Sequence, residues 1–318
     1  MVDRPGLAAP PEGLIIETVT PLTARGELEP ASLARLVERS VAAADGLLVG
    51  GPGAGEGLAL PREVRLDAAA QTLAIVNGRL PVMFGITGGT AAETREMAFA
   101  VRQVVDRQGY QGPVFLADLS LWYHSNRGLP QFYGAWLQEV GLPLVLMNLP
   151  EVMQQRAFLF KHRNFRTQVI KKLAALPEIS GLIYQGEMRR FLNYHLAAVS
   201  RLTFAFYEAD ENRFLTRPGA WGVVSPGAQL YPEAWQRVTR ACLHPEEIGE
   251  DPAARHHLWE ESARLLNLAG LYRPAPAALL KAALAAQGII AGDAIAAGTP
   301  QPPPPQKQKL RDFPLVFS

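Results

Sequence analysis

The chain has little of what marks several common classes of protein. Its 318 residues include one cysteine, Cys242, so an internal disulfide cannot form, and a reducing compartment such as the cytoplasm suits the chain. The formal net charge of +1 gives no electrostatic reason to expect nucleic acid or an anionic membrane as a partner. No stretch reaches the ~18 apolar residues that a membrane span requires. We therefore expect a cytoplasmic protein that binds neither nucleic acid nor membrane.

Signatures of bound metals and nucleotides are missing too. His256 and His257 are adjacent on a predicted helix and so point apart, and no other histidine pair has useful ligand spacing. A metal site needs three or four protein ligands. The sequence contains neither GxGxxG nor a glycine-rich loop that ends in Lys-Ser or Lys-Thr. It therefore predicts no metal and no cofactor.

Short apolar runs alternate with amphipathic helical patterns along most of the chain. The runs are four to six residues long and mostly do not alternate in polarity, which is typical of parallel strands buried on both faces. Their strict βα order predicts an α/β fold, a closed (β/α)8 TIM barrel, and a repeat of roughly 30 residues favours it over an open doubly wound sheet. The predicted strands are Leu14–Thr18, Gly46–Gly50, Pro81–Gly85, Val114–Ala117, Pro143–Asn148, Gly181–Tyr184, Thr203–Tyr207 and Gly222–Ser225.

The βα alternation stops after about residue 245, which divides the chain into four parts. We expect a flexible leader at 1–12, the barrel at 13–245, extra C-terminal helices at 246–290 and a proline-rich tail at 291–318. The polyproline stretch in the tail should be extended rather than helical. The helices expected between and after the strands are Ala31–Ala44, Pro61–Val76, Ala92–Gln108, Leu129–Val140, Thr167–Leu176, Met188–Ser200, Ala209–Thr216 (the weakest pattern), Tyr231–Leu243, Ala253–Ala269 and Pro276–Gln287.

Polar and glycine-rich segments follow several of the predicted strands. Active sites of such barrels lie at the carboxyl ends of the strands, so these segments are the candidates for ligand binding. The loop Gly50–Gly57 can turn its backbone N–H groups toward a small anion such as a carboxylate, although a tight turn with positive φ also explains its glycines. A closed barrel brings the loops to one rim, where we expect a common cavity. The candidate ligand-binding residues are Gly53, Ala54, Gly55, Glu56, Tyr123, Asn148 and Tyr184.

Six segments, in order, resemble the dihydrodipicolinate synthase / N-acetylneuraminate lyase family. They are GLIIETVTPL (13–22), DGLLVGGPGAGEGLALPREVR (45–65), GRLPVMFGITGGTAAETREMA (78–98), GLPLVLMNLP (141–150), LPEISGLI (176–183) and GAWGVVSPGAQLYPEAW (219–235). The resemblance covers roughly residues 13–290 and implies a class I aldolase or lyase acting on pyruvate or a related 2-oxo acid. It also implies a homodimer or homotetramer, because family members are commonly one or the other.

The chain departs from the family pattern where the family's chemistry takes place. The resemblance implies a Schiff-base lysine at the position of Ile183 and a proton-shuttling tyrosine at the position of Met147. The paired hydroxyl residues that hold the substrate carboxylate match Gly53 and Ala54. Isoleucine cannot form an imine and methionine cannot transfer a proton, so these departures affect the reaction and leave the packing intact.

Two main hypotheses follow for the function. In the first, the chain does not carry out the family's reaction, and it binds a small ligand, expected to be a carboxylate, or serves as an assembly partner. In the second, it is an active lyase or aldolase with a relocated nucleophile or another mechanism. A barrel enzyme of unrelated chemistry is the remaining alternative. Of the six lysines, only Lys161 lies in a predicted strand-end loop. That basic loop, residues 154–166, could cover an anionic ligand or be an ordinary solvated surface loop.

Overall fold

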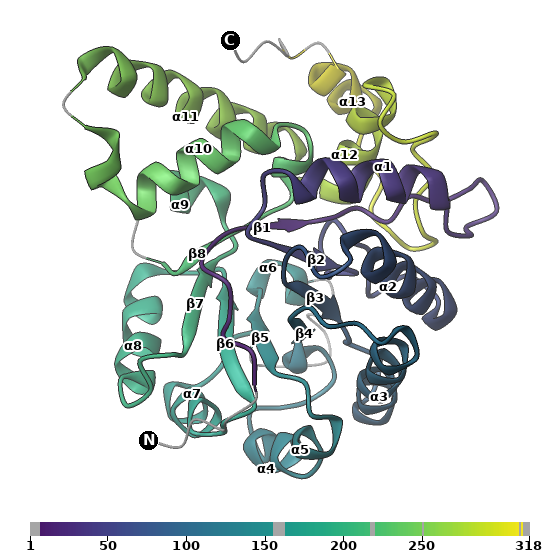
Figure 1. Cartoon of the computed structure of the whole chain (residues 1–318), viewed down its shortest axis with the longest axis vertical. Coiled ribbons are helices and arrows are strands. Elements are labelled where there is room, and N and C mark those ends of the chain that lie inside the picture. Colours follow the sequence, from purple (N-terminus) through teal and green to yellow (C-terminus); the bar gives the residue numbers. More distant parts are fainter. Residues whose placement is uncertain (1–6, 155–162, 217–219, 250, 312, 314–318) are drawn as a thin grey trace.

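The computed structural model describes residues 7–154, 163–216, 220–249, 251–311 and 313. Eight parallel strands close into a barrel in sequence order, so the predicted TIM barrel is confirmed (Figure 1). All strand residues are buried except the half-buried Glu208, as expected for strands covered on both faces. The strands are β1 Gly13–Glu17, β2 Gly46–Val49, β3 Val82–Gly85, β4 Val114–Asp118, β5 Leu144–Asn148, β6 Ile179–Tyr184, β7 Ala205–Glu208 and β8 Gly222–Ser225.

Helices surround the barrel at nearly the positions that the sequence predicts. The local signals are ordinary: α3 starts after Thr90, whose side chain accepts the N–H of Glu93, and it ends at Gly109 with φ of +58°. The helices are α1 Pro30–Val41, α2 Arg62–Val76, α3 Ala91–Gln108, α4 Leu129–Gly134, α5 Leu137–Val140, α6 Pro150–Met153, α7 Thr167–Ala174, α8 Met188–Ala198, α9 Glu211–Thr216, α10 Pro232–Leu243, α11 Pro252–Tyr272, α12 Pro276–Ala286 and α13 Pro304–Arg311.

One segment predicted as a single helix forms two helices in the structure. The segment expected to be helical over Leu129–Val140 is broken between α4 and α5 at Trp136, whose backbone φ of −143° is not helical. The indole is 1 % exposed, so burying this large side chain in the core accompanies the break in the helix.

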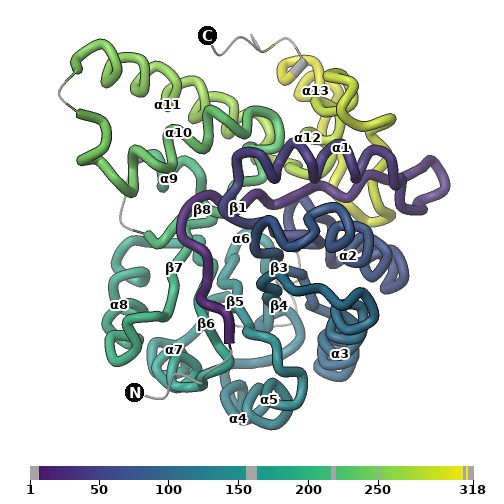
Figure 2. Tube along the Cα trace, in the orientation of Figure 1, coloured from purple at the N-terminus to yellow at the C-terminus, as the bar shows by residue number. Residues whose placement is uncertain are grey.

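The carboxyl-terminal part of the chain folds back beside α1 (Figure 2). Arg35 of α1 donates to the carbonyl of Ile289, and Ser32 Oγ accepts the N–H of Ala291. The expectation of an extended polyproline stretch is wrong at its end, because Pro304 begins α13, which packs against α11 and α12. Prolines are tolerated in the first helical turn, where the missing N–H would have no partner in the helix. No described helix is both long and apolar enough to cross a bilayer.

Candidate ligand-binding site

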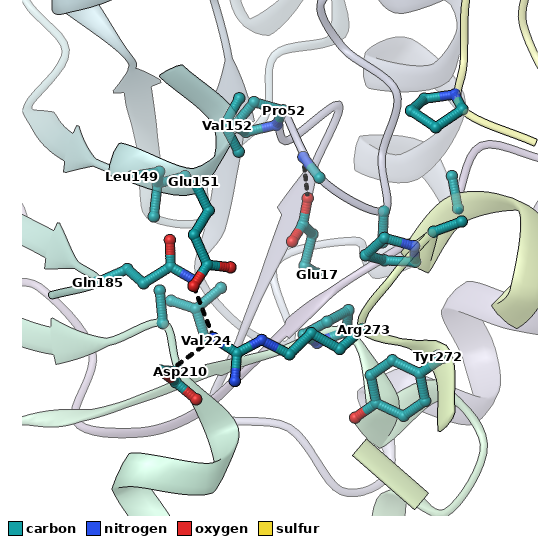
Figure 3. Close-up of a pocket in the computed structure, with 18 of the residues that line it drawn as sticks. Glu17, Pro52, Leu149, Glu151, Val152, Gln185, Asp210, Val224, Tyr272 and Arg273 are labelled. Carbon is teal, nitrogen blue, oxygen red and sulfur yellow. Dashed lines mark hydrogen bonds and ion pairs between the residues drawn. The ribbon is translucent and has the colours of Figure 1, made fainter. Parts of the chain in front are cut away.

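A cavity of about 700 Å³ opens at the carboxyl ends of the strands. Barrel strands, the glycine-rich loop after β2, the end of α11 and the carboxyl-terminal tail all contribute to its wall, as Figure 3 shows in part. The tail contributes Gly298, Thr299 and Pro300, none of which is among the predicted site residues. The charged and amide side chains among the described lining residues are Glu17, Glu56, Glu151, Gln154, Gln185, Asp210, Glu211, Asn212 and Arg273.

Glu17, the last residue of β1, reaches into the glycine-rich loop. Its Oε1 accepts the backbone N–H groups of Gly53 at 3.1 Å and Gly55 at 3.3 Å. A Cβ at Gly51 would overlap this carboxylate, so the glycines permit its close approach. The side chain is largely buried, and burial raises its pKa to about 7 against the opposing effect of the amide hydrogen bonds.

The loop therefore does turn its amides toward a carboxylate, and that carboxylate belongs to the chain itself. The loop also contains the positive φ angles of the alternative interpretation, at Gly50 (+64°) and Glu56 (+56°). A non-glycine residue at such a φ carries a conformational cost, which surrounding contacts must offset.

Contacts of Glu56 explain how its backbone is held. Its carboxylate is paired with Lys281 of α12, whose side chain is completely buried. Glu56 Oε1 also accepts the N–H of Ala296 at 2.8 Å and the hydroxyl of Thr299 at 2.9 Å. Burial lowers the pKa of Lys281, and the amine donates as well to the carbonyl of Ala294 at 2.8 Å. Glu56 thus ties the loop to α12 and the tail.

Arg273, directly after α11, is the one cation among the described residues that line the cavity. It donates to Glu151 at 2.6 Å and to Asp210 at 3.4 Å, the ion pairs drawn in Figure 3. Asp210 is also paired with Arg213 and is nearly buried, whereas half of the Glu151 side chain is exposed to solvent. Of the two carboxylates on Arg273, Glu151 is therefore the one that can leave most easily.

Glu211 lies deeper in the same wall. Its carboxylate accepts the hydroxyls of Ser225 and Tyr272 and the N–H of Gly227, and burial raises its pKa. Its charge contributes to the raised pKa of Glu17. The cavity thus contains more carboxyl groups than cations among its described residues. No three His, Cys, Asp or Glu side chains in the described ranges are grouped to hold a metal ion.

The predicted site residues divide between the cavity and the layer outside it. Gly53, Ala54 and Glu56 line the cavity, as do Met147 and Ile183 at the two positions that depart from the family pattern. Gly55 contributes its N–H to Glu17.

The expectation that Tyr123, Asn148 and Tyr184 share the cavity is wrong, since none is among its lining residues. Successive strand residues point to opposite faces, so Asn148 and Tyr184, which follow Met147 and Ile183, point away from the barrel interior.

Each of those three polar side chains has a structural partner. The hydroxyl of Tyr123 donates to Asp118 at 2.6 Å, and that of Tyr184 donates to the carbonyl of Glu187 at 2.9 Å. Asn148 accepts the N–H of Phe165 at 3.0 Å. Lys161 and most of the basic loop, residues 155–162, lie outside the described residues.

Comparison with known proteins places this chain in a family. A model described as the dihydrodipicolinate synthetase family matches residues 10–302. The chain belongs to this family. The resemblance predicted from six short segments is thus confirmed, and the match extends over the barrel, the C-terminal helices and the start of the tail.

Individual members of the dihydrodipicolinate synthetase family are distant in sequence. The 4-hydroxy-tetrahydrodipicolinate synthase of Shewanella piezotolerans is 26% identical over 243 residues, which cover 73% of this chain and 75% of that protein. A dihydrodipicolinate synthase of Bacillus anthracis has the same fold, with a TM-score of 0.78 at 18% identity over 96% of this chain and 98% of that one. A dihydrodipicolinate synthase of Acinetobacter baumannii, solved with pyruvate, has a TM-score of 0.77 at 22% identity over 95% and 97%.

Proposed function

We propose that the cavity binds a small 2-oxo acid or a sugar-acid type ligand and that the chain does not form the family's imine there. The observation that carries this proposal is the lining itself: Ile183 and Met147, both about 1 % exposed, stand in the cavity wall. The family resemblance implies the Schiff-base lysine and the proton-shuttling tyrosine at these two positions. An alkyl side chain offers no amine for the keto carbon, and a thioether carries no proton to transfer.

Arg273 is the group best suited to hold the carboxylate of such a ligand. A guanidinium group binds a carboxylate through two parallel N–H donors, and charge-assisted hydrogen bonds of this kind are the stronger ones in proteins. In this structure the guanidinium group of Arg273 donates a hydrogen bond of 2.6 Å to the carboxylate of the half-exposed Glu151. A ligand carboxylate would replace Glu151, whose solvent exposure makes that exchange inexpensive.

Two variants with opposite expected effects test this assignment. Arg273→Gln should weaken binding of pyruvate or gluconate by about tenfold or more, because it removes a charge-assisted hydrogen-bond donor. Glu151→Gln should strengthen the same binding, because it weakens the internal competitor for Arg273. Isothermal titration calorimetry measures both, with circular dichroism as the check on folding. Equal affinities in the wild type and Arg273→Gln would show that Arg273 does not bind the ligand carboxylate.

Absence of imine formation can be tested by chemical trapping. We expect incubation with pyruvate and borohydride to leave the intact mass unchanged, under conditions that label an active dihydrodipicolinate synthase run in parallel. The competing function, a lyase with a relocated nucleophile, is favoured by one observation: Lys281 is buried beside the cavity-lining Glu56 and has a lowered pKa. A stable adduct that peptide mapping places on Lys281, or on Lys161, would support that function instead.

The predicted cytoplasmic location and the predicted homodimer or homotetramer stay predictions of the sequence and of the family resemblance.

A further inference from the structure

The glycine-rich loop presents an anion-binding surface to the cavity. The N–H groups of Gly53 and Gly55 converge on a single oxygen, Oε1 of Glu17. A Cβ at Gly53 would lie 3.3 Å from each of the two carboxylate oxygens, and one at Gly51 would overlap Oε1. Converging backbone N–H groups in a concave loop bind carboxylates in general, whichever molecule supplies the carboxylate.

Glu17 is an unusual occupant for a surface of this kind. No ion pair to its carboxylate is found among the described residues, and Glu211 nearby adds negative charge rather than removing it. The side chain is only 8 % exposed and lies in the cavity wall. Burial of a carboxylate without a cation costs stability, so the packing of the barrel alone gives no reason for a glutamate at this position.

We propose that Glu17 occupies the amides of Gly53 and Gly55 in place of an anionic group of a ligand, so that the cavity selects a hydroxy acid with one carboxylate over a dicarboxylate. This inference rests on the proposed function, in which Arg273 holds the ligand's carboxylate. With the loop filled, the ligand meets Glu17 instead of free N–H groups. A carboxyl group accepts a hydrogen bond from a hydroxyl when ionised and donates one when protonated. A second ligand carboxylate would find its donors taken and would face a negative neighbour.

The variants Glu17→Ala and Glu17→Gln separate occupancy from charge. Alanine empties the loop, whereas glutamine loses the charge and keeps an oxygen that can accept both N–H groups. Acetate is the probe for the loop, because its binding at Arg273 is common to the wild type and both variants. We expect Glu17→Ala to bind acetate at least about tenfold more tightly than the wild type, and Glu17→Gln to bind it no better than the wild type.

Each other pattern of acetate binding overturns the proposal. An equal gain in both variants would mean that negative charge, not occupancy, excludes the anion. A gain in neither variant, or acetate binding by the wild type as tight as by Glu17→Ala, would mean that Glu17 does not fill an anion site. If Glu17→Ala does not fold, Glu17→Ser supplies the same comparison with a small polar side chain.

The ligand class is tested with two three-carbon acids. Lactate brings one carboxylate and a hydroxyl, and malonate brings two carboxylates. We expect the wild type to bind lactate more tightly than malonate and Glu17→Ala to reverse that order; a wild-type preference for malonate contradicts the selection of hydroxy acids. The acetate comparison repeated in Arg273→Gln distinguishes this failure from a failure of the proposed function, because the loop's gain of acetate does not depend on Arg273.

Discussion

As the pH rises from 4 to 8, the free energy of unfolding of Glu17→Gln relative to the wild type is expected to increase by about 3 kcal/mol. The pKa of Glu17 is about 7 in the folded chain and 4.5 for an ordinary glutamate, the largest cause being burial. Below pH 4.5 the carboxyl group is protonated in both the folded and the unfolded state, so it does not lower the free energy of unfolding. Between pH 4.5 and 7 it ionises first in the unfolded state, and the folded wild type loses stability progressively. Above pH 7 the loss is complete.

Glutamine does not ionise, so the variant avoids this loss while keeping an acceptor for Gly53 and Gly55. Urea unfolding at a series of pH values measures the free energies of unfolding of both proteins. Other buried acids with raised pKa values that do not interact with Glu17, such as Asp118, are present in both proteins and largely cancel in the difference. A stability difference that stays constant from pH 4 to 8 would show that Glu17 titrates at its ordinary pKa.

The barrel could be predicted from the sequence because its signals are local. A strand buried on both faces is an apolar run whatever its neighbours are, and six family-like segments fix the order of the units. Helix ends at Thr90 and Gly109 likewise carry their own capping residues. The break at Trp136 was not predicted because an apolar helical pattern continues through it, and it accompanies the burial of the indole in the folded barrel.

The site was harder to predict because it depends on which face of a strand each residue occupies. A one-residue difference in the assumed alternation separates Met147 and Ile183, which line the cavity, from Asn148 and Tyr184, which point outward. Asn148 and Tyr184 were candidates because they are polar residues at strand ends, and neither lines the cavity.

Glu17 and Lys281 did carry a signal in the sequence. Glu17 ends the apolar run GLIIE, and Lys281 is the only charged residue in the apolar helix PAALLKAALAA. A lone charge at a position that the pattern predicts to be buried requires a partner or a raised or lowered pKa. The partners themselves could not be identified, because Glu17 meets the loop at Gly53 and Lys281 meets Glu56 only in the folded barrel.

Lys281→Met is expected to destabilise the chain by about 3–5 kcal/mol, because it leaves the carboxylate of Glu56 buried without its cation. The double variant Glu56→Gln with Lys281→Met should recover much of that loss. Glutamine keeps the acceptor for Ala296 and Thr299, and methionine fills the space of the lysine stem in a fully buried position. Urea unfolding of the wild type, both single variants and the double variant gives the coupling energy between the two positions.

The same substitution at Lys307 is the matched control. Lys307 pairs with Asp293 at 2.9 Å in the same carboxyl-terminal region, but both side chains remain partly exposed to solvent. Exposed ion pairs contribute about 0–1 kcal/mol, so Lys307→Met should change the free energy of unfolding by no more than that. If Lys281→Met costs as little as Lys307→Met, or if the two single losses simply add in the double variant, the Glu56–Lys281 pair does not hold the loop to α12. In that case the positive φ of Glu56 and the wall of the cavity must be maintained by the hydrogen bonds from Ala296 and Thr299 alone.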